Sequence, residues 1–245
     1  MPMKSNYNSL FSKIESSELK KYPLLSCCVK DGVLIPERYE KSPLKILFVL
    51  KEPYSDWDEE TGAPSNCNFN FSDIVDDLDY HYEKGLNRTW LKVSAIAYSL
   101  KNKTPYSENL SYEQVVDGLS CVAWINLSKT PWHSTTKMDS SYIKPVRTWE
   151  PVVKAQFSQI NADIIFYGNT WDFSFVNPIE PDIPWNNNFC TDEKTYEYQS
   201  EGGNKYRIFI SKYRDTNKIL VNGYHPEFGN SADWQTEFIK DYLEN

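Results

Sequence analysis

The sequence predicts an α/β fold, a three-layer αβα sandwich in which helices cover both faces of a central, mostly parallel four-stranded sheet. Three observations support this prediction. Short unbroken apolar runs recur along the chain, helix-like stretches lie between them, and no Gly/Ser-rich or Pro-rich linker divides the 245 residues. Strands that alternate with helices imply right-handed crossovers and a parallel sheet that is covered on both faces.

The strands are expected where the chain is apolar without interruption. An unbroken apolar run fits a strand buried on both faces better than a strand with one face in water, which alternates. Four such runs occur, at residues 45–50, 121–127, 162–167 and 218–222.

The helices are expected between and after these runs, at residues 89–100, 111–119, 147–160 and 231–243. Ser111 is well suited to begin the second of them, because a serine hydroxyl accepts a hydrogen bond from a free N–H of the first turn.

The organisation expected is a single domain over residues 1–245, with an N-terminal extension at 1–40 and an insertion at about 170–213. The insertion departs from the alternating rhythm. Its second half predicts a β-hairpin, with strands at 196–199 and 206–213 and a turn at Glu201-Gly202-Gly203-Asn204.

The net charge of −8 excludes a protein held to nucleic acid by bulk electrostatics, so any such contact must be local. The 8 Trp, 17 Tyr and 12 Phe leave rings for a binding surface after a core is filled. No run of about 18 apolar residues and no signal-peptide pattern occurs, so a soluble, cytoplasmic protein without a membrane partner is expected. The five cysteines form no CxxC pair, and no metal, organic cofactor or disulfide is expected. A monomer is expected.

Polar residues follow the predicted strands. Glu52 comes after the first strand, Asn126 closes the second, and His225 follows the fourth. Ligands of open parallel sheets bind beyond the carboxyl ends of the strands, so we expect a carboxylate, a carboxamide and an imidazole at one edge.

These segments resemble the motifs of the uracil-DNA glycosylase superfamily. Leu50-Lys51-Glu52-Pro53-Tyr54-Ser55 is similar to the family's Gly-Gln-Asp-Pro-Tyr-His, Trp124-Ile125-Asn126 to its Leu-Leu-Leu-Asn, and His225-Pro226-Glu227 to its His-Pro-Ser. The three motifs stand in the family's order, each after the corresponding strand, and the resemblance covers residues 45–245 apart from the insertion.

The resemblance implies a monofunctional DNA glycosylase that flips a pyrimidine out of single- or double-stranded DNA and leaves an abasic site. Glu52 would orient the attacking water and stabilise the oxocarbenium-like sugar, and His225 would donate a hydrogen bond to O2 of the departing base. Asn126 would bind the base edge. Phe71, or alternatively Phe69, would stack on the base.

The departures from the family concern the base. Tyr54 matches a tyrosine that excludes 5-substituted pyrimidines, but Glu replaces Asp, Lys51 replaces Gln, and the late motif lacks its serine. Because Lys51 and Glu52 alter the floor of the base-binding pocket, the base stays open between uracil and a modified cytosine. A modified cytosine would suggest defence against phage DNA.

Each residue also has an ordinary structural interpretation. Glu52 could cap a helix, Asn126 could bond neighbouring backbone and His225 could be a satisfied buried histidine. Ser128, Lys129 and Thr130 suit contacts with DNA phosphates, or form a plain polar loop. His81 and His133 are expected at the surface or the edge of the core. Two functional alternatives stay open: a catalytically silent member that binds DNA or protein, and an N-glycosidase of free nucleosides or nucleotides.

Overall fold

The structure is a computed structural model. It describes residues 28–51, 53, 57–58, 63–64, 70–130, 140–171 and 189–245. The helices described are α2 (Pro36–Lys41), α3 (Phe71–Asp76), α4 (Leu78–Glu83), α5 (Arg88–Asn102), α6 (Tyr112–Leu119), α7 (Ser140–Gln159) and α8 (Ser231–Glu244).

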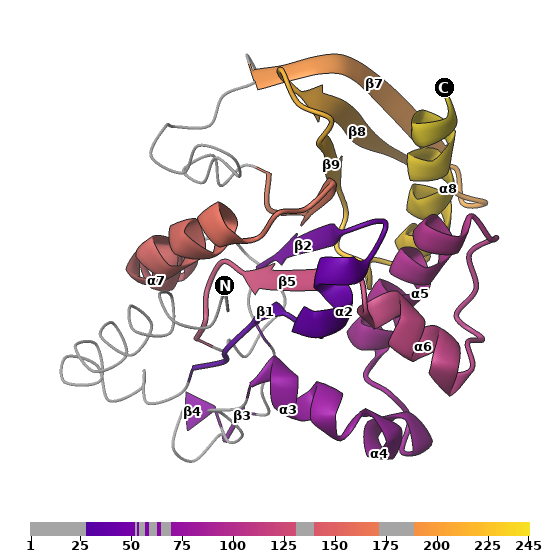
Figure 1. Ribbon diagram of the computed structural model, residues 1–245. Coiled ribbons are helices and arrows are strands. Elements are labelled where there is room, and N and C mark those ends of the chain that lie inside the picture. Colours follow the sequence, from indigo (N-terminus) through magenta and orange to yellow (C-terminus); the bar gives the residue numbers. More distant parts are fainter. Residues whose placement is uncertain are drawn as a thin grey trace.

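The main sheet contains seven strands in the order β1-β5-β2-β6-β9-β8-β7. Four central strands pair in parallel: β5 (Val122–Asn126), β2 (Ile46–Leu50), β6 (Ile164–Gly168) and β9 (Ile219–Gly223). Antiparallel strands flank them: β1 (Gly32–Val33) beside β5, and β8 (Lys205–Tyr213) and β7 (Cys190–Gln199) beyond β9. A separate pair consists of β3 (Trp57–Asp58) and β4 (Ala63–Pro64) (Figure 1).

The α/β class is confirmed, but the prediction of a four-stranded sheet is wrong. The predicted hairpin forms as β7 and β8, and it extends the sheet through antiparallel pairing with β9. At the opposite edge β1 adds a strand from within the supposed N-terminal extension, which also contains α2. The strand β1 was missed because it is only two residues long, and the pairing of the hairpin with β9 was missed because its outer strand β7 has no buried side chain that would link it to the core.

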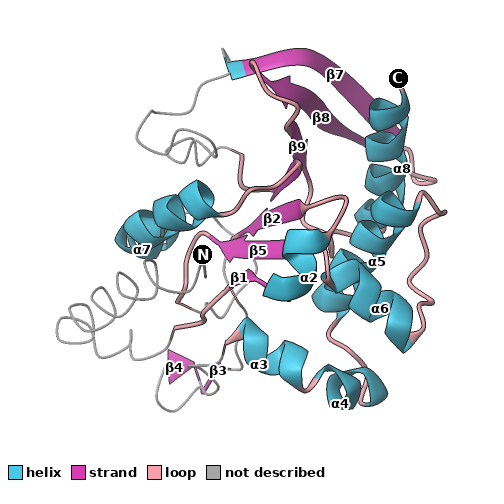
Figure 2. Ribbon diagram, viewed as in Figure 1, coloured by secondary structure: helices cyan, strands magenta, loops and turns pink. Residues whose placement is uncertain are grey.

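Alternate side chains of the parallel strands enter two different cores. Phe48 packs in the cluster that includes Val93 and Ile96 of α5, and residues of α6 and α8 complete that layer. Leu47 packs in the cluster that includes Val153 and Phe157 of α7. Helices therefore cover both faces of the parallel strands, as Figure 2 shows, and each strand reads as an unbroken apolar run for this reason.

Two local predictions are confirmed by hydrogen bonds. Ser111 begins α6 and its hydroxyl accepts from the N–H of Gln114, whose side chain accepts from the N–H of Ser111 in return. The turn between β7 and β8 is closed by the N–H of Ser200, which donates to the carbonyl of Asn204 at 2.9 Å. Gly203 adopts φ +80° there, a conformation that favours glycine.

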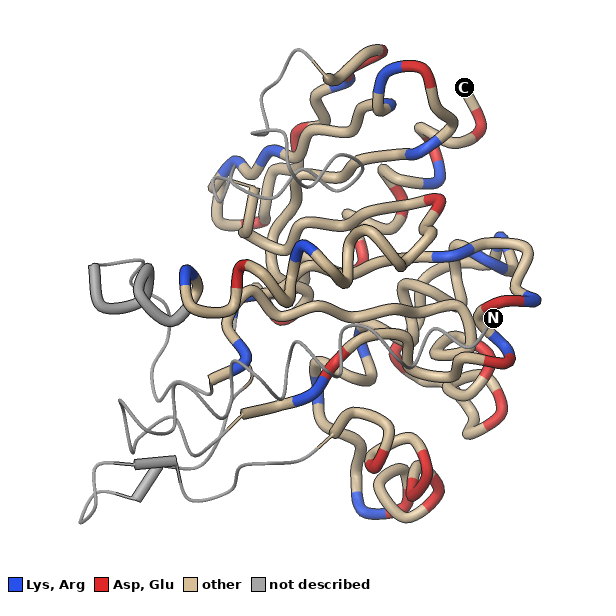
Figure 3. The backbone as a smooth tube through the Cα atoms, turned by 60° about the vertical axis from the view of Figure 1, so that its left-hand side comes forward, with Lys and Arg blue, Asp and Glu red and all other residues tan. Residues whose placement is uncertain are grey.

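Charged residues are mixed over the surface. Figure 3 shows the positions of Lys and Arg scattered among those of Asp and Glu along the backbone, and acidic residues are frequent in α3 and α4. In the part of the chain that the structure describes, no helix is both long enough and apolar enough to cross a membrane.

Candidate functional site

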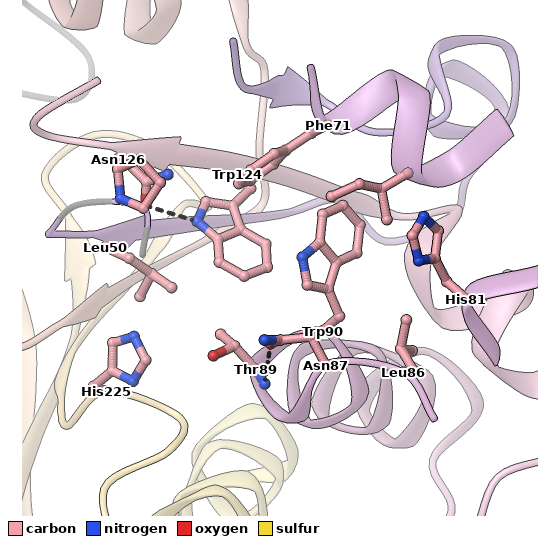
Figure 4. Close-up of a pocket in the computed structure, with 12 residues that line it drawn as sticks. Leu50, Phe71, His81, Leu86, Asn87, Thr89, Trp90, Trp124, Asn126 and His225 are labelled. Atoms are coloured by element: carbon pink, nitrogen blue, oxygen red, sulfur yellow. Dashed lines mark hydrogen bonds between the residues drawn. The ribbon is translucent and has the colours of Figure 1, made fainter. Parts of the chain in front are cut away.

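A pocket of about 230 Å³ opens beyond the carboxyl ends of the parallel strands, beside the start of α5. It is enclosed by side chains from the ends of β2 and β5, the helices α3 to α5 and the loop after β9 (Figure 4). The lining residues are Leu50, Pro53, Phe71, Ile74, His81, Leu86, Asn87, Thr89, Trp90, Trp124, Asn126 and His225.

Three of the residues predicted from the sequence meet in this pocket, although the chain separates them widely. Asn126 is the last residue of β5, His225 follows β9 by two positions, and Phe71 begins α3. Leu50 and Pro53, which stand on either side of Lys51 and Glu52 in the sequence, also line it. Parallel strands bring their carboxyl ends to one edge, which explains the convergence.

Three predicted site residues, Glu52, Tyr54 and Phe69, lie outside the described residues. Lys51 is described and buried, and it is not among the described residues that line the pocket. Its positive charge contributes to lowering the pKa of His225.

The carboxamide of Asn126 is oriented by a neighbour on the same strand. The indole N–H of Trp124 donates to Oδ1 of Asn126 at 3.1 Å, because residues two apart in a strand point to the same face. The side chain of Asn126 is only 1% exposed, and its Nδ2 has no hydrogen-bond partner in the described part of the chain. The structure therefore holds a buried N–H donor at the pocket.

His225 has a neutral ring, and the nitrogen that accepts a hydrogen bond can be identified. The backbone N–H of Glu227 donates to its Nδ1 at 3.2 Å. Burial lowers the pKa of His225 from 6.5 to about 4; the Glu227 carboxylate opposes this shift, and the charges of Lys51 and Lys92 add to it. A neutral imidazole carries one N–H, and because Nδ1 accepts, the proton resides on Nε2. His225 is thus a hydrogen-bond donor through Nε2 near pH 7.

The loop that carries His225 is fastened to α5 by side chains that sequence reasoning missed. The hydroxyl of Thr89, a lining residue, donates to the carboxylate of Glu227. Lys92 is completely buried, and its ammonium donates to the carbonyl of Gly229 at 2.9 Å. Both bonds join the first turns of α5 to residues 227–229, so the helix fixes the position of the imidazole.

Three large rings form one wall of the pocket. Phe71 meets Trp90 and Trp124 edge-on, with ring centroids 5.0 and 5.1 Å apart, and the two indoles lie 5.4 Å from each other. All three side chains are buried, each exposed by 5% or less. Such a wall suits a flat heterocycle, which stacks on or packs against aromatic faces.

The predicted phosphate contacts face the interior instead. Ser128 and Thr130 are buried. The hydroxyl of Ser128 donates to the carbonyl of Thr130 and accepts from its backbone N–H, and the hydroxyl of Thr130 accepts from the indole N–H of Trp149. Lys129 is 0% exposed and forms an ion pair with Asp31 at 2.5 Å. These side chains are hydrogen-bonded within the protein and each is exposed by 7% or less, so their geometry argues against the phosphate role.

The ion pair of Lys129 with Asp31 supports the backbone of Asn126. Asp31 accepts from the ammonium of Lys129 through Oδ1 and from the backbone N–H of Asn126 through Oδ2, at 2.7 Å. Gln156 of α7 bonds both partners, at 2.8 Å to each. The cluster lies directly behind Asn126 and holds its backbone in place.

Comparisons with known proteins do not name a family. A scan against protein-family models finds no match, and a search of curated proteins finds none. The site must therefore be interpreted from its own residues.

Several lining residues were not predicted from the sequence. His81 is half-buried, as expected for a residue at the edge of the core, and it also lines the pocket at the end opposite His225, which was not predicted (Figure 4). Trp124 had a usable signal, since it precedes Asn126 by two positions in a strand. Thr89 and Trp90 lie at the start of a helix whose direction relative to the sheet is not encoded in its own pattern.

Proposed function

We propose that the protein is a DNA glycosylase that hydrolyses the bond between deoxyribose and a flipped-out pyrimidine, either uracil or a modified cytosine. The observation that carries the proposal is the convergence of Asn126 and His225 on one aromatic-walled pocket, beside Leu50 and Pro53. Glu52 lies between those two residues in the sequence. The convergence of these residues on one pocket supports the resemblance of the three motifs to those of the uracil-DNA glycosylase superfamily.

The polar groups of the pocket suit a leaving group that becomes negative. Hydrolysis joins the oxygen of water to C1′ and breaks the bond from C1′ to the base nitrogen, whose electron pair stays on the base. His225 presents a neutral N–H, and Asn126 presents an amide N–H that has no partner among the described residues. Fixed donors in a site of low polarity stabilise developing negative charge strongly, because they need no reorganisation.

In this proposal Glu52 has the complementary role at the sugar. Positive charge builds on the deoxyribose ring as the base departs, and a carboxylate stabilises it and orients the attacking water. The proton that water loses neutralises the carboxylate or the released base, so free base and an abasic site are the products.

The pocket is large enough for either candidate base. A cavity of about 150 Å³ is enough to hold a benzene ring, and this pocket measures about 230 Å³. A pocket of this size would accept either a pyrimidine with water or a pyrimidine with a substituent.

The test is base release from defined DNA by the full chain. Oligonucleotides with one uracil, cytosine or 5-hydroxymethylcytosine, single-stranded and duplex, would be incubated with the protein, and released bases measured by mass spectrometry. We expect release from uracil or from the modified cytosine. Glu52→Gln and His225→Ala should each slow release by about 10²–10³-fold. Glu193→Gln, on the exposed side of β7, is the matched carboxylate control and should leave the rate unchanged.

Three outcomes would contradict the proposal. Binding of DNA without release of any base would identify a catalytically silent protein. Release only from mononucleosides would identify a nucleoside N-glycosidase. Base release at the wild-type rate by Glu52→Gln would remove Glu52 from the chemistry.

A further inference from the structure

The bond between Trp124 and Asn126 leaves no choice in how the carboxamide is turned. An indole N–H is only a donor, so the group that it meets at 3.1 Å must be the carbonyl oxygen of Asn126 and not its amide nitrogen. The amide nitrogen then occupies the other position of the carboxamide. A free asparagine can be turned over to present either group, and this one is locked.

The indole itself is held firmly. Its ring packs against Phe71 and Trp90, its side chain is 4% exposed, and its backbone lies opposite Gly32 of β1 and Phe48 of β2 in the sheet. A buried indole that packs against two other rings has no free space in which to swing away from Asn126.

The locked amide nitrogen has no partner in the described residues, although it is buried. A buried donor that is left without an acceptor costs more than its hydrogen bond would contribute, and native structures rarely tolerate one without a reason. Because Asn126 lines the pocket, a ligand in the pocket is the group that would satisfy this donor.

We propose that Trp124 determines which base edge the pocket accepts. It fixes Asn126 as a hydrogen-bond donor, so the pocket binds a base that turns a ring nitrogen or carbonyl acceptor toward Asn126 and rejects a base that turns an N–H there. The inference rests on the proposed function, since it assumes that a base occupies the pocket, and it adds the rule by which the base is chosen. Trp124 acts through Asn126 and is a positioning residue.

The test compares two nucleosides of nearly equal size. 2′-Deoxycytidine and 2′-deoxyuridine exchange donor and acceptor at N3 and at the 4-position, so in one binding pose the fixed amide N–H meets an acceptor on one base and a donor on the other. Their dissociation constants for the full chain would be measured by NMR titration. We expect the wild type to prefer one of them by about tenfold or more, the size expected for one well-made hydrogen-bonded pair.

Trp124→Phe removes the indole N–H and keeps an aromatic ring in the wall. Freed from its donor, Asn126 can turn over and bond either edge, so the preference should fall to within about threefold. Trp234→Phe is the matched control, because it makes the same change in α8, at a ring that packs on Tyr198 and is not among the residues that line the pocket. It should keep the wild-type preference. Asn126→Asp, which offers acceptors only, should weaken binding of the preferred nucleoside by about tenfold or more.

A wild type without preference, a Trp124→Phe variant that keeps the wild-type ratio, or a Trp234→Phe variant that loses it equally would overturn the inference. So would a failure of both nucleosides to bind. The proposed function fails separately: a preference that depends on Trp124, together with no base release from any oligonucleotide, would leave the inference standing and remove the glycosylase.

Discussion

Asn126 and His225 each owe their hydrogen-bonding direction to a residue two positions away. Trp124 donates to the oxygen of Asn126, and the N–H of Glu227 donates to Nδ1 of His225. In both cases a group that can only donate occupies an acceptor and leaves an N–H for the pocket. A site of this kind is prepared for an electron-rich ligand before any ligand arrives.

The lowered pKa of His225 predicts a pH dependence of stability. The folded protein holds the ring with a pKa of about 4, against 6.5 ordinarily, so the unfolded chain binds more protons between these values. The free energy of unfolding should therefore rise with pH from about 4 to 6.5, by at most about 1.4 kcal/mol per pH unit, and the contribution of His225 should be constant above that range. Urea unfolding of the wild type and His225→Gln across this range measures the difference.

The His225→Gln variant provides the contrast, since it keeps a polar side chain that does not titrate. Wild type and variant should diverge in slope only below pH 6.5. Parallel curves throughout would show that His225 titrates with its ordinary pKa in the folded protein.

At the scale of the elements, α5 is the helix on which the pocket depends. It supplies Thr89 and Trp90, and it fastens the loop of His225 through Lys92. Its own position is set by close packing against α6, where Gly118 faces the backbone of Ser94.

Gly118→Ala should destabilise the protein through this contact. A methyl group at residue 118 would lie 2.3 Å from the carbonyl oxygen of Ser94, and backbone cannot give way as a flexible side chain does. We expect a loss of about 1–3 kcal/mol in the free energy of unfolding, typical of overpacked sites. Gly202→Ala is the control, since the nearest atom to its methyl group would be 3.9 Å away. Equal unfolding midpoints for the two variants in urea would contradict the prediction.

The parallel strands and their ends could be predicted, because a strand that is buried on both faces has an unbroken apolar sequence. Each of these runs is followed by polar residues. Asn126 and His225 were found in this way, and the structure brings them together. The residues of α5 were predicted, but the position of its first turn in space could not be. The pattern of a helix shows which of its faces is apolar and does not show where its first turn lies relative to the sheet. The hairpin was predicted from its turn, but nothing local shows that it joins β9.

At the scale of the whole molecule, one buried cluster joins the N-terminal segment, the sheet and α7. Asp31 precedes β1, Lys129 follows β5, and Gln156 comes from α7. Asp31 and Lys129 are 98 positions apart, and no pattern in the sequence connects them. Lys129 was therefore interpreted as a surface lysine, which is the commoner place for that residue.

Lys129→Met should be strongly destabilising, because it leaves the carboxylate of Asp31 buried without its counter-charge. Breaking one side of a buried pair costs about 3–5 kcal/mol. The double variant Asp31→Asn with Lys129→Met removes both charges and should recover part of the loss. Lys205→Met, which breaks an exposed pair with Glu197, should change stability by about 1 kcal/mol or less. A Lys129→Met variant as stable as Lys205→Met in urea would refute this account of the cluster.

The carboxylate of Asp31 also limits how far the chain can be shortened from its N-terminal side without disturbing the pocket. Every described residue that lines the pocket lies at position 50 or later, so a truncated protein that begins at Lys45 would look complete if only these residues were considered. It would lack Asp31, the acceptor for the N–H of Asn126, and in the described part of the chain the ammonium of Lys129 would keep only its bond to Gln156. Expression of a shortened form, or transplantation of the pocket to another scaffold, must therefore carry the segment from Val29 onward.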